Sequence, residues 1–392
     1  MSRRIGVAVI GMGWMGSVHA RCYRLVPQRF PELDVDPRLV VCADNVGARA
    51  QEGVTRAGFE RATTDWREAI ADPEVEMVNI TTQNALHKPV ALAAIEAGKH
   101  VFCEKPVGRS PAETAAIAAA AQAAGVISGV GYNYRWAPVV QYALRLIGEG
   151  RLGTITHFRG RFLVGYARDP HGVLSWRFDR EQSGSGAVAD LMSHVADLAH
   201  MLAGPVERLV ANRHTFIAER PLPTPGEGTH FSVRRGGPTG PVTNEDYGSA
   251  LVQFACGAQG TYEVCRVING PKCQLAFEIS GTGGTILWDF ERMNELQLYL
   301  PDGTPERDGT VWVQAGPEHP FFANFNPGAA LGMSYEDLKV VEAAQFAKSV
   351  VERTQREPGL AEADRVGQVL AAFDRSVDSG AWETVAPVPV PA

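Results

Sequence analysis

The segment that most constrains the fold is a glycine-rich turn between an apolar run and a helical pattern. The apolar run Val7–Ile10 predicts a buried strand, the turn reads Gly11-Met12-Gly13-Trp14-Met15-Gly16, and a helical pattern covers Ser17–Leu25. In this context the first glycine permits a tight turn, the second lets a pyrophosphate approach the backbone, and the third lets the helix pack on the strand. Free N–H groups at the helix start then bind the phosphates. The sequence therefore predicts a dinucleotide site at Gly11, Gly13, Trp14, Met15 and Gly16.

A second apolar run, Leu39–Ala43, predicts a strand that ends at Asp44. A carboxylate at this place can accept both ribose hydroxyls of NAD and repels the extra phosphate of NADP. The separation from Gly16 exceeds that of the usual motif, and we attribute the excess to a proline-bearing loop over Pro27–Pro37. Arg49 could tolerate a 2′-phosphate, so NAD is the preferred cofactor and NADP the alternative.

Strands and helices continue to alternate as far as residue 130. The predicted elements are a helix that starts at Asp65, strands over Val75–Ile80, Val101–Cys103 and Val126–Val130, and helices over His87–Ala97 and Pro111–Ala124. Such alternation predicts an α/β fold, a Rossmann-type doubly wound parallel sheet. Ligands bind at the carboxyl ends of its strands, so we expect Thr81, Asn84 and His87 beside the nicotinamide half of the cofactor. Helix capping explains Asn84 nearly as well.

The tripeptide Glu104-Lys105-Pro106 follows directly on the predicted strand Val101–Cys103. A lysine that ends a buried strand is partly desolvated, so it is more easily discharged and better able to polarise or deprotonate a hydroxyl. A solvated surface lysine is the alternative for such a tripeptide taken alone. Because the same sequence contains the glycine turn, we assign Glu104 and Lys105 to the cofactor site and predict that Lys105 is catalytic.

A second candidate constellation is Asp190 and His194, within a helical pattern over about Val188–Ala203. Residues four apart project from one helix face, so the two side chains can meet one substrate. His194 is the natural general base, because an unperturbed imidazole pKa of about 6.5 allows proton uptake near neutrality. Asp190 would orient the substrate or stabilise the imidazolium. We interpret His200 as a core residue and Asp197 as a structural hydrogen-bonding group.

With the glycine turn, Asp44, Glu104-Lys105-Pro106 and Asp190-x-x-x-His194 in this order, the sequence resembles the Gfo/Idh/MocA family of sugar and inositol dehydrogenases. The resemblance covers nearly the whole chain. It implies that Lys105 touches both the reacting hydroxyl and the nicotinamide ribose. It also implies that Pro106 shapes the turn, often as a cis peptide.

Further motifs resemble a branch of this family that acts on anhydrosugars such as levoglucosan, on glycosides or on inositols. They are Tyr132–Arg135, Leu174–Phe178, Gly184–Ala187, Val233–Pro238 and Gly240–Val242. The resemblance implies NAD-dependent oxidation of a secondary ring hydroxyl to a ketone, at C3 in levoglucosan. Alternatives that use the same residues are an inositol 2-dehydrogenase and a cofactor-recycling glycosidase or epimerase. A dinucleotide-sensing protein is the non-enzymatic alternative, since fold alone does not fix function.

The substrate site is predicted around Trp176, whose ring would supply a flat apolar face for a pyranose. Core packing is an equal alternative for this tryptophan. Arg177, Tyr134 and Arg135 would contribute hydrogen bonds. Residues 161–171, which include Tyr166, Arg168 and His171, are expected to form a substrate loop.

The second half of the chain has mostly period-2 patterns with glycine-containing turns, typical of antiparallel strands. The predicted strands are Thr154–Val164, Tyr247–Phe254, Gln259–Val267, Gln274–Ser280, Thr285–Phe290 and Leu296–Leu300. They predict an α+β domain with a large, mostly antiparallel open sheet, its inner face covered by the helix at Val188–Ala203. We expect an extended arm over Arg213–Asp246.

We divide the chain into a cofactor domain (1–130) and a substrate and oligomerisation domain (131–384), with helices at 335–353 and 361–376 bracing both. The tail 385–392 is predicted to be loose. The family resemblance implies a homodimer or homotetramer that associates through the open sheet.

Composition limits the class of protein further. The 392 residues carry a formal net charge of -7, so neither nucleic acid nor a membrane surface is an expected partner. No apolar run approaches the ~18 residues of a membrane span. Six scattered cysteines without Cys-x-x-Cys spacing indicate reduced thiols and no metal site. We therefore expect a cytoplasmic enzyme whose partner is a small sugar or cyclitol.

Overall fold

The computed structural model describes residues 3–224 and 232–388. The chain forms two compact units. Unit 1 runs to Trp136 and also includes Asn324–Pro327 and Met333–Asp364. Unit 2 consists of Ala137–Ala323, Gly328–Gly332 and the chain from Arg365 onward. In the described part of the chain, none of the helices combines the length and apolar character that a membrane crossing requires.

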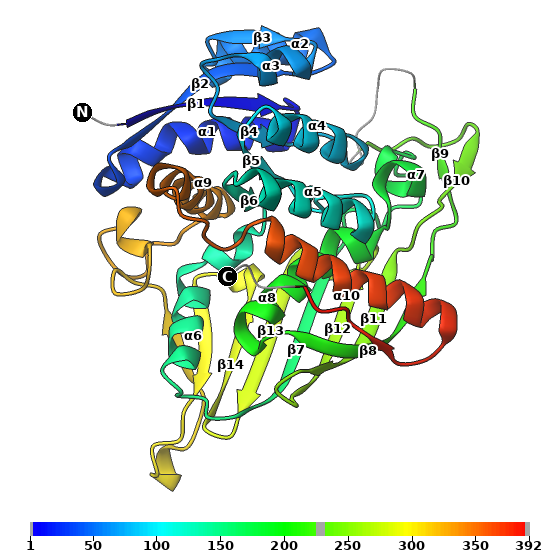
Figure 1. Ribbon diagram of the computed structural model, residues 1–392. Helices are drawn as coiled ribbons and strands as arrows, with labels where there is room; N and C mark the ends of the chain where they lie inside the picture. The colour runs from blue at the N-terminus through cyan, green and yellow to red at the C-terminus, as the bar shows by residue number, and fades with distance from the viewer. Residues whose placement is uncertain (1–2, 225–231, 389–392) are drawn as a thin grey trace. The chain divides into compact units, whose positions relative to one another are not determined.

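Unit 1 is built on a six-stranded parallel sheet with the strand order β3-β2-β1-β4-β5-β6 (Figure 1). Its strands are β1 (Arg3–Ile10), β2 (Val35–Ala43), β3 (Arg61–Thr63), β4 (Met77–Ile80), β5 (His100–Cys103) and β6 (Ser128–Val130). The strand order reverses between β1 and β4, which is where a doubly wound sheet binds its ligand. The predicted Rossmann architecture is confirmed.

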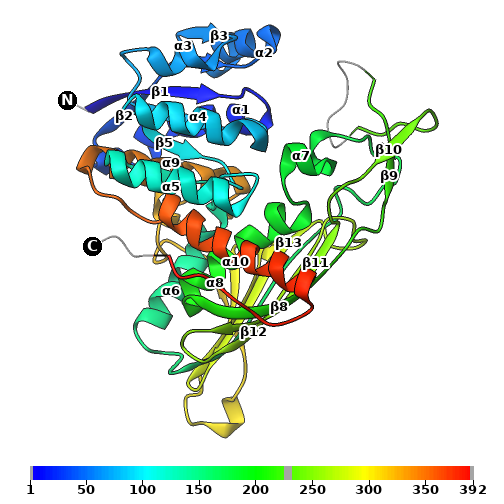
Figure 2. The same cartoon turned by 45° about the vertical axis from the view of Figure 1, so that its right-hand side comes forward.

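The helices of unit 1 cover both faces of this sheet. They are α1 (Trp14–Arg29), α2 (Gly47–Glu52), α3 (Trp66–Ala71), α4 (Asn84–Glu96), α5 (Pro111–Ala124) and α9 (Tyr335–Glu352). Right-handed crossovers place α1 and α2 on one face and α3 to α5 on the other. Figures 1 and 2 show α4 and α5 side by side, and α9 packs against α1. Asp65 caps α3 by accepting the N–H of Arg67, in agreement with the predicted helix start. Gly98, with φ +69°, lies just beyond the end of α4.

The predicted proline loop over residues 27–37 is wrong. Helix α1 continues through Pro27 to Arg29, and β2 begins at Val35 and includes Pro37. Pro37 is tolerated because β3 pairs only with Val41–Ala43, so β2 is an edge strand at the proline. The extra length between Gly16 and Asp44 therefore comes from a longer helix and a longer strand.

Unit 2 is built on a nine-stranded sheet with the order β16-β15-β14-β13-β7-β12-β11-β8-β17. The strands are β7 (Ile155–Val164), β8 (Val206–His214), β11 (Tyr247–Phe254), β12 (Gln259–Cys265), β13 (Cys273–Gly281), β14 (Gly284–Asp289), β15 (Glu295–Tyr299), β16 (Val311–Gln314) and β17 (Glu383–Thr384). Only the β7–β12 pair is parallel among these strands. The predicted large, mostly antiparallel sheet is confirmed, although β8, β16 and β17 were not predicted.

Helix α8 (Ser193–Ala203) covers the inner face of this sheet and packs on β7 and β13. The prediction of one regular helix from residue 188 is wrong at its start, because Val188–Met192 forms a π-helical turn. Asp190 lies in the π turn and His194 in α8, so the two do not share a regular helix face. Such turns are frequent at functional sites. Helices α6 (Pro138–Gly148) and α7 (Arg180–Ser183) also belong to unit 2.

The predicted arm over residues 213–246 contains structure of its own. β9 (Glu219–Pro221) and β10 (Thr239–Pro241) pair as an antiparallel ribbon, and residues 225–231 lie outside the described residues. Helix α10 (Leu360–Ser379) begins in unit 1 and ends in unit 2. The tail is tied down at its start, since Val385 is buried and donates its N–H to Glu207. Residues 389–392 of the predicted loose tail are outside the described residues.

Candidate functional site

The glycine turn has the geometry that a dinucleotide requires. Gly11 has φ +96°, a conformation that favours glycine, and a Cβ on Gly16 would lie 2.0 Å from the carbonyl oxygen of Gly11. A Cβ on Gly13 would meet no atom within 4 Å, so the space next to this residue is open. Thr81 fixes the turn, donating its hydroxyl to Gly11 O at 2.6 Å. The turn therefore fits a pyrophosphate that approaches the backbone at Gly13.

Asp44 is joined to the same turn. Its Oδ2 accepts the N–H of Met12 at 2.8 Å, and its Oδ1 accepts the N–H of Val46 at 2.9 Å. The carboxylate is buried, and each oxygen keeps a lone pair for a further donor. The end of β2 and the glycine turn are thus held together at the place where the sequence predicts the ribose.

The residues after β4 also lie in unit 1. Asn84 is the first residue of α4 and Gln83 is its N-cap, so the capping interpretation of Asn84 is wrong by one position. His87 is buried, with Nδ1 2.8 Å from the carbonyl oxygen of Pro106 and Nε2 3.1 Å from that of Thr82. Its predicted contact with the nicotinamide half stays a prediction.

Two aromatic pairs lie beside the glycine turn. Trp14 is 64% exposed and stacks on Tyr335 at 5.9 Å between ring centroids. Tyr335 also contacts Tyr134 at 6.2 Å. Tyr134 and Arg135 lie in a 3₁₀ turn, Asn133–Trp136, that belongs to unit 1 and is buried.

Lys105 lies two residues after the end of β5 and is half-buried. The Lys105–Pro106 peptide is cis, as the family resemblance implies. The carboxylate of Glu104 accepts the backbone N–H of Lys105 at 3.3 Å through Oε2. Lys105 thus lies at the carboxyl end of a buried parallel strand, as predicted.

Beneath this turn lies a buried charged cluster that the sequence analysis missed. It consists of His19 from α1, Glu104 from the end of β5, and Lys339 and Glu342 from α9. Glu104 Oε1 is 2.8 Å from His19 Nε2 and 2.6 Å from Lys339 Nζ, which also lies 2.9 Å from Glu342 Oε1. The available signal was a lysine and a glutamate three residues apart within the apolar run of α9.

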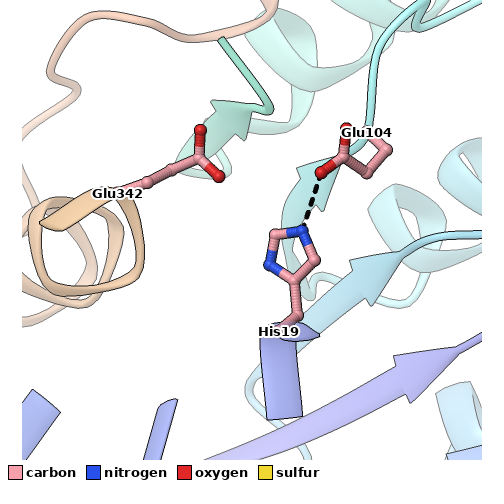
Figure 3. Close-up of side chains that lie close together, drawn as sticks. All are labelled: His19, Glu104 and Glu342. Carbon is pink, nitrogen blue, oxygen red and sulfur yellow. Dashed lines mark hydrogen bonds and ion pairs between the residues drawn. The ribbon is translucent and has the colours of Figure 1, made fainter. Parts of the chain in front are cut away.

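Figure 3 shows His19, Glu104 and Glu342 with their polar atoms turned toward one another, an arrangement of groups that could hold a metal ion. The ammonium of Lys339 lies within 3 Å of both carboxylates. It supplies the positive charge that a metal would otherwise supply. We therefore interpret the cluster as an ion-pair network.

The cluster shifts the ionisation of its members. Burial opposes the ionisation of Glu104, but Lys339 and His19 hold the pKa of Glu104 well below its usual range. Burial raises the pKa of Glu342 to about 8. Burial lowers the pKa of His19, so a neutral ring donates its Nε2 proton to the Glu104 carboxylate. Burial opposes the charge of Lys339, but Glu104 and, to a smaller extent, Glu342 outweigh it and raise the pKa of Lys339, which stays protonated.

In unit 2, the structure brings Asp190, Tyr166 and Arg177 together. The Tyr166 hydroxyl donates to Asp190 Oδ2 at 3.1 Å, and Arg177 Nη1 lies 3.9 Å from Asp190 Oδ1. Burial, with the nearby Asp190 carboxylate, raises the pKa of Tyr166. The guanidinium of Arg177 lies over the ring of Trp176, which is half-buried, at 4.5 Å. The predicted loop over residues 161–171 is wrong at its start, because residues 161–164 belong to β7. Tyr166 lies in the remaining segment beside Asp190, and its contact with a substrate stays a prediction.

His194 is buried and its ring lies edge-on to Phe162, 5.8 Å between ring centroids. Asp197 is fully enclosed in the protein, in keeping with a structural role. His200 is half-buried, so its prediction as a core residue is only partly correct.

A second network that the sequence analysis missed supports Asp190. Glu245 Oε1 accepts the N–H groups of Gly186 at 2.6 Å and Val188 at 3.0 Å, at the entry to the π turn. Asn244 donates to the carbonyl oxygen of Arg177 at 2.9 Å. These two neighbours therefore position the segments that carry Asp190 and Arg177.

Comparisons with known proteins agree with these observations. A model described as an oxidoreductase family with an NAD-binding Rossmann fold matches residues 5–132, and the GFO/IDH/MocA C-terminal domain matches residues 140–287. Levoglucosan dehydrogenase of Pseudarthrobacter phenanthrenivorans is 38% identical over 384 residues, which is 98% of each chain. The chain belongs to the Gfo/Idh/MocA family.

Solved members of the Gfo/Idh/MocA family share the fold of the whole chain. Levoglucosan dehydrogenase in complex with NADH and levoglucosan matches with a TM-score of 0.93 and 36% identity, over 98% of this chain and 100% of that chain. A scyllo-inositol 2-dehydrogenase (NAD(+)) of Bacillus subtilis is 27% identical over 287 residues, 73% of this chain and 74% of the relative. The family resemblance drawn from the motifs is confirmed, and unit 1 contains an NAD-binding Rossmann domain. The chain is an oxidoreductase related to sugar dehydrogenases.

Proposed function

We propose that this protein oxidises a secondary ring hydroxyl of an anhydrosugar or related pyranoside to a ketone, with NAD as the acceptor. The observation that carries the proposal is the 38% identity, over 98% of both chains, to levoglucosan dehydrogenase. A solved structure of such an enzyme holds NADH and levoglucosan and matches this chain over 98% of its length. The glycine turn, Lys105 and the Asp190–His194 pair provide groups suited to the same chemistry.

In this proposal Lys105 binds and polarises the reacting hydroxyl. His194 accepts the hydroxyl proton, and Asp190 orients the sugar or stabilises the imidazolium that forms. Lys105 belongs to unit 1, whereas Asp190 and His194 belong to unit 2. The proposal therefore requires that residues of both units serve one alcohol.

Bound NAD would supply the hydride acceptor. Gly13 and its neighbours in the turn would hold the pyrophosphate, while Asp44 would accept the ribose hydroxyls. The carboxylate also repels a 2′-phosphate, which favours NAD over NADP. The hydrogen bonds from the N–H groups of Met12 and Val46 keep this charge in place.

The substrate side is proposed to consist of Trp176, Arg177 and Tyr166. The guanidinium on the Trp176 ring presents a mixed apolar and donor surface. Pyranose rings bind such surfaces with their C–H groups on the aromatic face and their hydroxyls on the charged groups. Tyr134 and Arg135 of unit 1 remain proposed contacts.

An inositol dehydrogenase is the second candidate, favoured by the similarity to scyllo-inositol 2-dehydrogenase. The test is a panel of anhydrosugars, pyranosides and inositols with NAD or NADP, scored by NADH absorbance. We expect the highest kcat/KM for an anhydrosugar or pyranoside with NAD. A preference for inositols would favour the second candidate. Sugar turnover without lasting NADH absorbance would indicate a cofactor-recycling enzyme. Binding of NADH without turnover of any sugar or inositol would indicate a dinucleotide sensor.

We also propose a homodimer or homotetramer formed through the outer face of the nine-stranded sheet. Strand register places Leu251, Thr261, Arg159, Glu278, Leu287, Gln297 and Trp312 in one cross-strand row. The row is apolar at its two ends, where Leu251 is 53% and Trp312 is 52% exposed. A hollow of about 440 Å³ lies along it. Light scattering measures the molar mass of the wild type and of a Trp312→Glu variant in solution. The proposal predicts an oligomer for the wild type and its dissociation in the variant.

A further inference from the structure

The turn that carries Lys105 is held on both sides within unit 1. After it, Pro106 O lies 2.8 Å from His87 Nδ1. Before it, Glu104 Oε1 contacts His19 Nε2 at 2.8 Å and Lys339 Nζ at 2.6 Å. Because Lys105 is the residue between these two anchored neighbours, its backbone depends on both.

The space for the Glu104 carboxylate is provided by Gly131. A Cβ at Gly131 would lie 2.5 Å from Glu104 Oε2, closer than real contacts allow. The same Oε2 accepts the backbone N–H of Lys105 at 3.3 Å. The Glu104 carboxylate is thus held by hydrogen bonds and fills the space that a side chain at position 131 would occupy. These contacts determine its orientation.

Lys339 is the strongest anchor of this carboxylate. Its side chain is 1% exposed, and charge-assisted hydrogen bonds are about twice as strong as neutral ones. Glu342, three residues along α9, accepts a second bond from the same ammonium at 2.9 Å. The cost of burying three ionisable groups is large unless they are paired. The proposed mechanism uses none of them directly.

We propose that Lys339 is a positioning residue for the oxidation: by holding Glu104, it fixes the backbone from which Lys105 reaches the substrate hydroxyl. This inference rests on the proposed function, in which Lys105 acts on that hydroxyl. Lys339 itself touches neither substrate nor cofactor in this scheme.

The proposal has a pH signature. The titratable and charged groups around Glu104 are His19 on α1, Cys103 on β5, and Lys339 and Glu342 on α9. Lys339 opposes the effect of burial and keeps Glu104 ionised. In Lys339→Met the burial remains and the cation is gone, so Glu104 must protonate at a higher pH. A protonated Glu104 is a weaker acceptor, and the loss of activity toward acid pH therefore begins at a higher pH than in the wild type.

The experiment compares Lys339→Met with Lys348→Met, which removes a half-exposed lysine of the same helix. Steady-state kinetics with NAD and the best anhydrosugar are measured from acid to neutral pH, with NADH affinity measured separately. We expect kcat of Lys339→Met to fall about 10- to 100-fold, the scale of a small displacement of a reacting group. NADH affinity should be unchanged. The acid limb of the pH–activity profile, which is the fall of activity toward low pH, should move to a higher pH. In Lys339→Met/Glu104→Gln the shift should disappear.

Gly131→Ala provides an independent variant, because it displaces the carboxylate without removing a charge. Its kcat should fall as much as that of Lys339→Met, and its affinity for NADH should equal that of the wild type. The inference is overturned if Lys339→Met has the kcat and the acid limb of Lys348→Met. If Lys339→Met does not fold, full activity of Gly131→Ala overturns it.

Lys105→Ala is assayed in parallel. Wild-type activity in that variant would refute the proposed role of Lys105. An inactive Lys105→Ala beside an active Lys339→Met refutes only the present inference.

Discussion

The hydroxyl of Tyr166 donates to Asp190 Oδ2 at 3.1 Å, joining the loop after β7 to the π turn that precedes α8. Tyr166→Phe removes this bond and leaves the ring in place. One hydrogen bond to a charged group contributes about 1.5–3 kcal/mol, so we expect kcat/KM for the sugar to fall about 10- to 100-fold. NADH affinity should not change. Steady-state kinetics and a NADH titration measure both.

The matched control is Tyr262→Phe. Tyr262 is buried in the same unit, and its hydroxyl has no hydrogen-bond partner among the described residues. The same chemical change there should leave kcat/KM as in the wild type. Equal effects of the two substitutions would show that Tyr166 acts only through packing.

Substitutions at Gly16 and Gly13 test the effect of the glycine turn on stability and on cofactor binding separately. Gly16→Ala places a Cβ 2.0 Å from Gly11 O, so the helix must move and the protein should lose several degrees in Tm. Gly13→Ala meets no protein atom within 4 Å and should keep the wild-type Tm. It should nevertheless weaken NADH binding by tenfold or more, about 1.4 kcal/mol, because the methyl group fills the space for the pyrophosphate. Thermal unfolding with and without NADH checks both expectations. Normal NADH affinity in Gly13→Ala would place the pyrophosphate elsewhere.

Cofactor preference should depend on the charge of Asp44. Asp44→Asn keeps the size of the side chain but removes the repulsion of a 2′-phosphate. We expect the ratio of kcat/KM for NAD to that for NADP to fall by about tenfold, an energy of about 1.4 kcal/mol. Asp36→Asn is the control, because Asp36 lies on the strand that precedes Asp44 and is paired with Arg4 at the surface. An unchanged ratio in Asp44→Asn would remove Asp44 from the cofactor site.

Stability should depend on pH through Glu342. Burial raises the pKa of this carboxyl from 4.5 to about 8, so between these values the folded protein holds a proton that the unfolded chain has released. The free energy of unfolding therefore falls as pH rises through this window. Glu342→Gln cannot ionise, and its stability relative to the wild type should rise by as much as ~1.4 kcal/mol per pH unit. Urea unfolding between pH 5 and about 8 tests this sign. Glu352→Gln, exposed on the same helix, should show no such trend, and a pH-independent difference for Glu342→Gln would contradict the raised pKa.

What the sequence predicted well is local in the chain. The roles of Gly11 and Gly16 follow from the strand before them and the helix after them, and the structure has both as expected. The strand that ends just before Glu104 and Lys105 and the cap at Asp65 are equally local. Period-2 patterns predicted most strands of the second sheet, because one face of each strand is buried.

What the sequence could not predict depends on contacts between distant residues. Lys339 meets Glu104 across 235 positions, and Glu245 meets Gly186 across 59. No periodicity encodes such partners. The π turn at Asp190 was missed for the same reason, since the carboxylate that holds its entry comes from another part of the chain.

The central claim is that Lys105 and His194 act on the same alcohol, and a double-mutant cycle tests it most directly. The kcat/KM of Lys105→Ala, His194→Ala and the double variant is measured with NAD and one sugar, for proteins shown to be folded and to bind NADH. We predict that each single variant loses about 10²–10⁴-fold and that the double variant is about as active as the poorer single one, because groups that act as a unit are not additive. Wild-type activity in either single variant, or losses that multiply in full, would contradict the account.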